Sequence, residues 1–244
     1  MTVPFARTSN ILFSIACLIV IAVGGLQLRD RLFPGPEKSN GTTIPKASLT
    51  EPPPNTLIDV SKVTFKRQAT PAVVLLEFTD YECPFCARYA GEAYRQIQKA
   101  FVDRGLVAYG LFNHPLESIH KGARRASEAV ECAGLQGKFW ELHDVLFQRQ
   151  PRFEREHLVA YASELEMDTG QFERCIDNGE MASRVAQHLE VARSAGVAST
   201  PSFLIGVFDS PSQVRILYRL RGALKFVEFE KALTQALDSM PTPR

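Results

Sequence analysis

Cysteine is scarce in this sequence, and neither sign of charge is in excess. The 244 residues include five cysteines, too few for a disulfide-rich scaffold in a chain long enough to fold on a hydrophobic core. We therefore expect the cysteines to carry chemistry. Lysine and arginine (28) nearly balance aspartate and glutamate (27), and no Lys/Arg-rich run occurs, so nucleic acid is not an expected partner. No internal repeat is visible.

Charged residues are absent between Arg7 and Arg29. The run Ile11–Leu28 is nearly all apolar, and as a helix it approaches the roughly 30 Å thickness of a bilayer's hydrocarbon core. No small-residue cleavage site follows it, so we expect an uncleaved N-terminal transmembrane helix within residues 1–32 rather than a removed signal peptide. Cys17 lies in the middle of this run, where it is expected to be a small apolar residue. More positive charges follow the run than precede it, so they do not favour an outside C-terminus, and the expected outside placement rests on the chemistry of the domain.

Proline is concentrated after this run. Residues 33–55 carry proline interspersed with glycine, serine, threonine and lysine, and show little apolar periodicity. Such a segment stays extended and solvated, so it is interpreted as a linker that holds the following domain away from the bilayer. The domain itself is expected to span residues 56–244.

Apolar runs indicate an α/β domain. Ala72–Phe78 and Leu106–Phe112 have the length and composition of buried strands, and the helical stretch 84–101 lies between them, which predicts a β-α-β unit. Residues 117–195 favour four or five helices, interrupted by glycine and proline. The other predicted elements are a strand-like segment at Leu57–Phe65, a hairpin of Ser202–Phe208 and Val214–Arg221, and a closing helix at Lys225–Ala236.

Cys83 and Cys86 form a Cys-Pro-Phe-Cys motif between the first buried strand and the helix. A cysteine at a helix N-terminus is stabilised as the thiolate by unpaired backbone N–H groups and the helix dipole, and Pro84 suits the first helical turn. Cys86, three residues on, lies on the same side of the helix but deeper. We therefore predict that Cys83 attacks or is attacked and that Cys86 resolves the mixed disulfide.

The same two cysteines are also half of a zinc site. Zinc would require a second pair of ligands, and neither Cys132 and Cys175 nor the scattered histidines have the spacing of such a pair. A strand followed directly by Cys-Pro-Phe-Cys and a helix is typical of a redox site. We expect no metal and no cofactor.

Three ordered segments resemble the DsbA-like branch of the thioredoxin superfamily. They are Glu77–Cys86 (EFTDYECPFC), Gln136–Phe147 (QGKFWELHDVLF) and Gly196–Phe203 (GVASTPSF), within a resemblance that covers about residues 56–236. The resemblance implies a thioredoxin fold with a helical insertion at about 117–195, here preceded by the N-terminal transmembrane helix.

The resemblance also implies roles for three residues. The bond Thr200–Pro201 matches a cis peptide bond of the family that faces the cysteines, which would place the Thr200 backbone where it can pair with a substrate peptide. Glu77 matches the family's buried acid and would relay the proton of Cys86 through water. The alternative for Glu77 is a position at the edge of the sheet, paired with a lysine.

One residue departs from the strongest oxidants of the family. They carry histidine between the two cysteines, whereas this chain has Phe85, which cannot carry charge or donate a hydrogen bond. The Cys83 thiolate is therefore expected to be less stabilised, and the disulfide less oxidising, than in those proteins.

Cys132 and Cys175 both lie in the predicted helical insertion. In an oxidising compartment they would be able to form a second, structural disulfide, and the alternative is two buried free thiols.

These observations predict a membrane-anchored thiol-disulfide oxidoreductase. Its substrates would be cysteine-containing proteins, and a membrane redox partner would recycle its active site. We expect a single-pass protein of the inner or cytoplasmic membrane with its catalytic domain on the periplasmic or extracytoplasmic side. Two alternatives are a thiol reductase or isomerase in cytochrome or metal-site maturation, and a thioredoxin-fold module that carries a metal ion.

Overall fold

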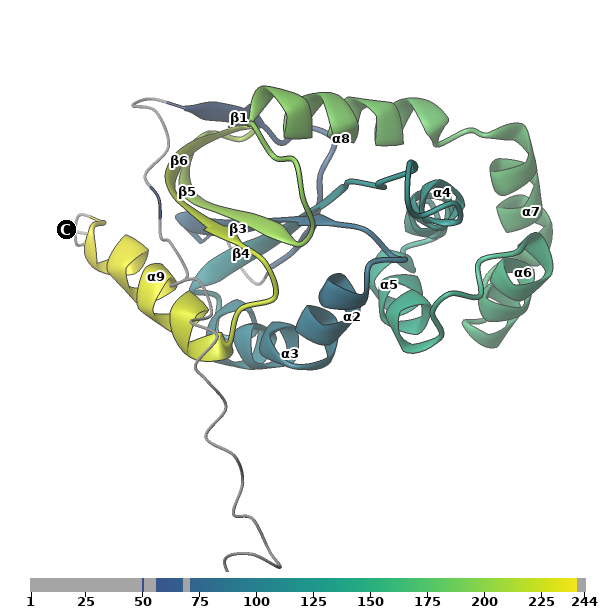
Figure 1. The fold of residues 1–244 in the computed structure, drawn as a ribbon, viewed down its shortest axis with the longest axis horizontal. Coiled ribbons are helices and arrows are strands. Elements are labelled where there is room, and N and C mark those ends of the chain that lie inside the picture. The colour runs from purple at the N-terminus through teal and green to yellow at the C-terminus, as the bar shows by residue number, and fades with distance from the viewer. Residues whose placement is uncertain (1–49, 51–55, 68–70, 241–244) are drawn as a thin grey trace, which may run out of the picture. The chain divides into compact units, whose positions relative to one another are not determined.

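The computed structural model describes residues 50, 56–67 and 71–240 (Figure 1). The predicted membrane helix, and all of the predicted linker except Thr50, lie outside the described residues. Among the residues described, no helix is both long and apolar enough to cross a membrane. Thr50 pairs with Arg219 through two backbone hydrogen bonds of 3.2 and 2.9 Å.

A six-stranded mixed sheet lies at the centre of the domain. Its strand order is β1-β6-β5-β3-β4-β2, and β3 and β4 are parallel whereas the other neighbouring pairs are antiparallel. Every residue of β3 is buried, because apolar side chains alternate between two covered faces of the sheet. The strands are β1 (Leu57–Asp59), β2 (Thr64–Lys66), β3 (Val73–Thr79), β4 (Val107–Asn113), β5 (Ser202–Ser210) and β6 (Gln213–Arg221).

The predicted strand at Leu57–Phe65 is two strands rather than one. β1 pairs with β6 and β2 pairs with β4, so the two short strands lie at opposite edges of the sheet. The chain turns between them, where the Asp59 carboxylate accepts a hydrogen bond of 2.8 Å from the Ser61 backbone N–H. Apolar alternation runs through the turn, because both short strands cover the same core, and it therefore hides the break.

Helices cover both faces of the sheet (Figure 1). One face packs against α2 (Pro84–Gly91), α3 (Ala93–Ile97), the π-helix η1 (Gln98–Val102) and α9 (Phe226–Asp238). The other face packs against α8 (Ala182–Ser194), which contributes Ala192 to a core with Val74, Leu76 and Phe112.

The helical insertion has a core of its own. Phe139, Leu142, Leu158 and Phe172 belong to this core, which is distinct from the two cores against the sheet. Together with α8, its helices are α4 (Ala123–Gly134), α5 (Phe139–Gln148), α6 (Arg155–Glu164) and α7 (Thr169–Asn178). The predicted α/β domain with a helical insertion is therefore confirmed.

Candidate active site

Cys83 caps the N-terminus of α2. Its backbone is extended, with φ −73° and ψ 121°, and Pro84 begins the helix. The Cys83 N–H donates to the Asp80 carbonyl at 3.1 Å, which closes a turn between β3 and the helix. The first-turn N–H groups of α2 lack helical partners, so they are free to face the sulfur. The sequence predicted this placement from the order strand, cysteine, proline.

Both cysteines are free thiols, and both are buried. Cys83 is 4% exposed and Cys86 is fully covered, so Cys83 is the more accessible of the two. Solvent reaches the Cys83 residue over only a small area, less than expected for an attacking cysteine at the surface. The hydrogen bond from the Cys86 thiol, with smaller contributions from Thr200 and from the N–H groups of Phe85 and Cys86, lowers the pKa of Cys83 to about 5. Burial raises the pKa of Cys86 well above its usual value. The two thiols therefore have opposite protonation at neutral pH.

Phe85 stands between the cysteines and is 54% exposed. The Arg88 guanidinium lies 5.2 Å from the centre of its ring, a cation-π contact one turn along α2. The site thus presents an apolar ring beside the pair, and the thiolate is stabilised by hydrogen bonds rather than by a neighbouring histidine.

The Thr200–Pro201 loop lies against Cys83. The peptide bond between these residues is cis, and the Cys83 sulfur lies 3.6 Å from the Thr200 carbonyl oxygen, to which it can donate only in its thiol form. Pro201 is buried, and its carbonyl accepts from the Gly222 N–H at 2.8 Å. These contacts place a backbone strand end directly beside the sulfur.

Glu77 lies in the middle of the sheet. It is 1% exposed on β3, between β4 and β5, so the alternative of an edge position paired with a lysine is wrong. The Tyr109 hydroxyl donates to Glu77 Oε2 and in turn lies 3.1 Å from the Tyr89 hydroxyl. Burial raises the pKa of Glu77 to about 7, and the charge of Glu77 contributes to the raised pKa of Cys86. A carboxyl group that titrates near neutral pH therefore lies close to the resolving thiol.

The turn before Cys83 is held by a loop that sequence reasoning missed. The buried Asp80 carboxylate accepts from the Leu116 N–H at 2.7 Å and lies 2.8 Å from His120 Nδ1. The Glu82 carboxylate accepts from the Gly122 N–H at 2.7 Å. In the sequence, only the two acids Asp80 and Glu82 hint at this contact with the loop. Acids in a turn are just as typical of residues exposed to solvent, so the sequence alone does not predict it.

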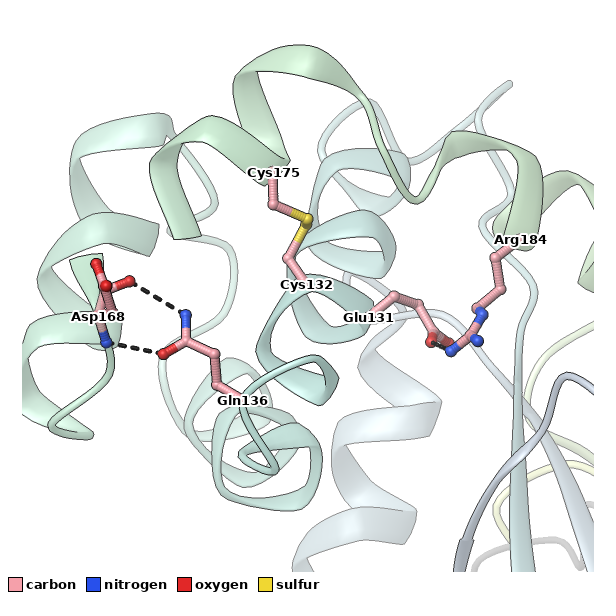
Figure 2. Close-up of a disulfide and its surroundings, with 6 residues drawn as sticks. All are labelled: Glu131, Cys132, Gln136, Asp168, Cys175 and Arg184. Carbon is pink, nitrogen blue, oxygen red and sulfur yellow. Dashed lines mark hydrogen bonds and ion pairs between the residues drawn. A yellow bond between two sulfur atoms is a disulfide. The ribbon is translucent and has the colours of Figure 1, made fainter. Parts of the chain in front are cut away.

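Cys132 and Cys175 form a disulfide between α4 and α7 (Figure 2). Both residues are buried in the core of the insertion, so they do not belong to the Cys83 site. The structure brings together Cys83, Cys86, Glu77, Thr200 and Pro201. Within the described part of the chain, no cluster of three or more His, Cys, Asp or Glu residues is arranged to hold a metal ion.

Comparison with known proteins gives a family and a fold. The thioredoxin family model matches residues 67–214. Oxidised BdbD from Bacillus subtilis superposes with a TM-score of 0.62 at 22% identity, covering 80% of this chain and 100% of that one. The α-DsbA1 structure from Wolbachia pipientis superposes with a TM-score of 0.63 at 15% identity, covering 74% of this chain and 94% of that one. Identities this low show a common fold.

Curated relatives share only a segment with this chain. The sequence is 35% identical over 133 residues to the Na(+)/H(+) antiporter NhaA 3 of Salinispora tropica, which is 54% of this chain and 20% of the antiporter. It is 37% identical over 175 residues to the antiporter NhaA of Herminiimonas arsenicoxydans, which is 68% of this chain and 26% of that protein. The chain thus spans about a quarter or less of these relatives.

Three findings agree on the family. The family model matches most of the described domain, the solved structures share its fold, and the site has the same order of strand, cysteine pair and helix. This chain belongs to the thioredoxin family and has the fold of its DsbA-like thiol-disulfide oxidoreductases.

Proposed function

We propose that this protein oxidises cysteine pairs in other proteins through a disulfide between Cys83 and Cys86. The observation that carries the proposal is the opposite shift of the two thiol pKa values at one helix N-terminus, with the Thr200 backbone beside the more acidic sulfur. A stabilised Cys83 thiolate makes the reduced enzyme stable, and hence makes its disulfide an oxidant.

The proposed reaction has two exchanges. A substrate thiolate attacks the Cys83 sulfur, the bond from Cys83 to Cys86 breaks, and Cys86 leaves as a thiolate that takes up a proton relayed from Glu77 through water. The second substrate thiolate then attacks the substrate sulfur of the mixed disulfide. Cys83 leaves as a thiolate, so the substrate loses two electrons and the enzyme gains them. Thr200 and Pro201 would hold the substrate backbone beside Cys83 during both steps.

Location and partner belong to the same proposal. The disulfide between Cys132 and Cys175 supports an oxidising compartment, because such bonds persist mainly outside the cytoplasm. We place the domain on the periplasmic or extracytoplasmic side of the inner or cytoplasmic membrane, with the apolar run Ile11–Leu28 as its single-pass anchor. A membrane redox partner would reoxidise Cys83 and Cys86 after each turnover.

One residue favours the opposite direction of electron flow, in which the protein acts as a thiol reductase. Phe85 supplies neither charge nor a hydrogen bond to the thiolate, which makes the disulfide less oxidising than it would be with histidine there. Equilibration of the purified protein with glutathione buffers distinguishes the two directions. An oxidant has a potential near or above the poise of about −180 to −210 mV found in an oxidising compartment, whereas a potential well below that range indicates a reductase.

Trapping of mixed disulfides tests the proposed chemistry itself. In cells that express Cys86→Ala, Cys83 is expected to remain joined to its substrates, because the resolving thiol is missing. The double variant Cys83→Ala/Cys86→Ala is the matched control and should form none of these adducts. A folded Cys86→Ala protein that yields no adducts cleaved by a thiol reductant would contradict the assignment.

A further inference from the structure

A cavity of about 400 Å³ lies between α2, the helix that Cys83 caps, and helix α5 of the insertion. Small residues of α2, among them Ala87 and Gly91, form one wall, and Asp144 of α5 lies on the opposite wall. Its remaining lining includes Arg95 of α3 and Gln98 of η1. The volume is within the range of cavities that bind ligands in proteins.

Gln98 lacks partners in this cavity. Its side chain is buried, with 7% of the residue exposed, and neither the amide nitrogen nor the amide oxygen has a hydrogen-bond partner among the described residues. A buried amide without partners is costly, so it indicates a ligand that supplies both a donor and an acceptor. A peptide group presents one N–H and one C=O, which match the two ends of the Gln98 amide. Gln98 also begins a π-helix, a distortion that is frequent at functional sites.

The cavity lining has more positive than negative side chains. Lys66 and Arg95 are cationic, and Asp144 is the one carboxylate among the lining residues that the structure describes. The Lys66 ammonium lies over the rings of Tyr94 and Trp140, at 5.7 and 5.6 Å from their centres, and so it is held at the cavity rather than swinging into solvent. One positive charge is left over, which favours an acidic group on the ligand.

Helix geometry connects the cavity to the reacting sulfur. Positions 83, 87 and 90 follow the i, i+4, i+7 spacing of one face of α2, and the last two line the cavity, which Tyr94 of α3 also lines beyond the break at Glu92. At 1.5 Å per residue, the lining residues Arg95 and Gln98 lie roughly 18 to 22 Å from Cys83 when the length is counted along the helices, and the break at Glu92 makes the straight distance shorter. An extended peptide rises about 3.3 Å per residue, so five to seven residues span this length, whereas a tripeptide does not.

We propose that this cavity binds the extended segment of a protein substrate that lies five to seven residues from its reacting cysteine. A peptide group of that segment pairs with the Gln98 amide, and an acidic side chain lies near Lys66 and Arg95. The proposal rests on the proposed thiol-disulfide exchange at Cys83 and names the substrate feature that the same site recognises.

Peptide probes of two lengths test the proposal on the full chain, purified in detergent and reduced. Each probe carries one cysteine in a disulfide with thionitrobenzoate. The Cys83 thiolate attacks the peptide sulfur and releases thionitrobenzoate as a coloured thiolate. Cys86 then attacks the Cys83 sulfur and releases the peptide thiolate, so the enzyme is oxidised by two electrons as the probe is reduced to two thiols. The long probes have 15 residues with a central cysteine and either glutamate or lysine at five to seven positions on both sides, and the short probe has three residues.

The rate on the tripeptide is the reference for each variant. At low salt the glutamate probe is expected to react about fivefold faster than the lysine probe, the size of effect that a partly exposed charge pair supports. Arg95→Glu should reverse this preference. Lys99→Glu makes the same change of charge on η1 at an exposed residue outside the cavity lining, and should retain the preference. Gln98→Leu should slow both long probes relative to the tripeptide and leave the melting temperature unchanged or higher, because it removes an unpaired amide.

Three results would overturn the subsite. The first is equal rates of the glutamate and lysine probes on the unmodified enzyme. The second is an equal response of Arg95→Glu and Lys99→Glu. The third is a Gln98→Leu variant that loses its rate on the tripeptide, because the cavity would then bind a small thiol rather than a longer peptide. Failure of the proposed function is distinguishable, because the unmodified enzyme would then release no thionitrobenzoate from the tripeptide either.

Discussion

At the scale of single residues, Glu77 is a carboxyl group in the middle of an apolar strand with no cationic partner among the described residues. The Tyr109 hydroxyl holds one of its oxygens, and the other has no hydrogen-bond partner in the described part of the chain. Because burial raises its pKa to about 7, the group is able to hold or release a proton at neutral pH. A residue that served only to fill the core would be apolar, so the cost of this carboxyl group indicates a function.

Glu77→Gln is expected to raise stability and to lower activity. The pKa of Glu77 is raised from 4.5 to about 7 in the folded state, so the folded protein binds the proton more tightly than the unfolded chain. The stability that depends on this proton is present below pH 4.5 and is lost as the pH rises through 7. At pH 8 the variant should therefore be more stable by roughly 3 kcal/mol at most, and at pH 4.5 the two proteins should be alike.

Urea unfolding at the two pH values measures this difference, and the rate at which Cys86 resolves a mixed disulfide measures the loss of activity. Glutamine keeps the shape and the acceptor for Tyr109 but cannot carry the proton. A variant that is no more stable at pH 8 than at pH 4.5, relative to the unmodified protein, would mean that Glu77 is not held protonated in the fold. An unchanged rate of resolution would remove Glu77 from the mechanism.

At the scale of elements, a buried polar cluster joins the insertion to the sheet. Glu131 of α4 is fully buried and accepts from Arg184 of α8 at 3.0 Å (Figure 2). It also accepts from the Asn113 side chain, at the end of β4, at 2.7 Å. Burial raises the pKa of Glu131 to about 7. His188 Nδ1 lies 3.8 Å from the carboxylate, and burial lowers the pKa of His188 to about 4, so that the ring is neutral near pH 7.

Arg184→Leu is predicted to destabilise the domain by about 2 kcal/mol at pH 8, because it leaves the Glu131 carboxylate buried without its cation. The loss should be smaller at pH 5, where Glu131 is protonated and its pairing with Arg184 contributes less. Glu131→Gln in the Arg184→Leu background should recover most of the loss. The control is Arg193→Leu on the same helix, which removes an exposed ion pair with Glu190 and should cost about 0.5 kcal/mol or less. Equal losses for the two arginines, measured by urea unfolding, would show that the burial of Glu131 does not strengthen its pair with Arg184.

Elements differ in how far the sequence predicts them. Apolar runs located β3 and β4 within a residue or two, because a strand buried on both faces has to be apolar throughout. The helix after Cys83 was predicted as continuous, whereas it breaks at Glu92, where φ is −115° and ψ is −86°. Gly91, the last residue of α2, is the one local signal of the break, and a single glycine is too weak a signal to predict it. On either side of the break the packing differs, because α2 contacts α5 whereas α3 contacts α9.

The site residues also differ in how far the sequence predicts them. Cys83, Cys86 and Pro201 follow from motifs that are local in sequence. The partners that tune them do not, because Tyr109 on Glu77 and the loop around His120 on Asp80 are set by contacts 32 and 40 residues apart in the chain. Glu131 reads as one of several surface acids of an amphipathic helix, and only the packing of three elements shows it buried.

At the scale of the molecule, the domain has two regions with separate hydrophobic cores. The sheet and its covering helices hold the Cys83 site, and the insertion holds the disulfide between Cys132 and Cys175. The insertion also lies against the site, because the Gln150 side chain after α5 donates to the Tyr81 carbonyl oxygen and lies 3.4 Å from the Cys83 carbonyl oxygen. Loss of order in the insertion is therefore expected to reach the turn that carries Cys83.

Replacement of both disulfide cysteines by alanine tests this coupling. The bond closes a loop of 43 residues, for which the chain-entropy relation gives a loss of about 4 kcal/mol in the free energy of unfolding. We expect amide hydrogen exchange to quicken first in α4, α6 and α7, next at Cys83 and Glu82, and least in β3 and β4, which are held by the sheet on both sides. Cys17→Ala, which removes a cysteine outside the described domain, should change none of these rates. Because the insertion core remains apolar without the bond, the variant should still fold. Equal acceleration in β3 and α7 would show instead that the two cores unfold as one cooperative unit and that the disulfide stabilises the site and the insertion alike.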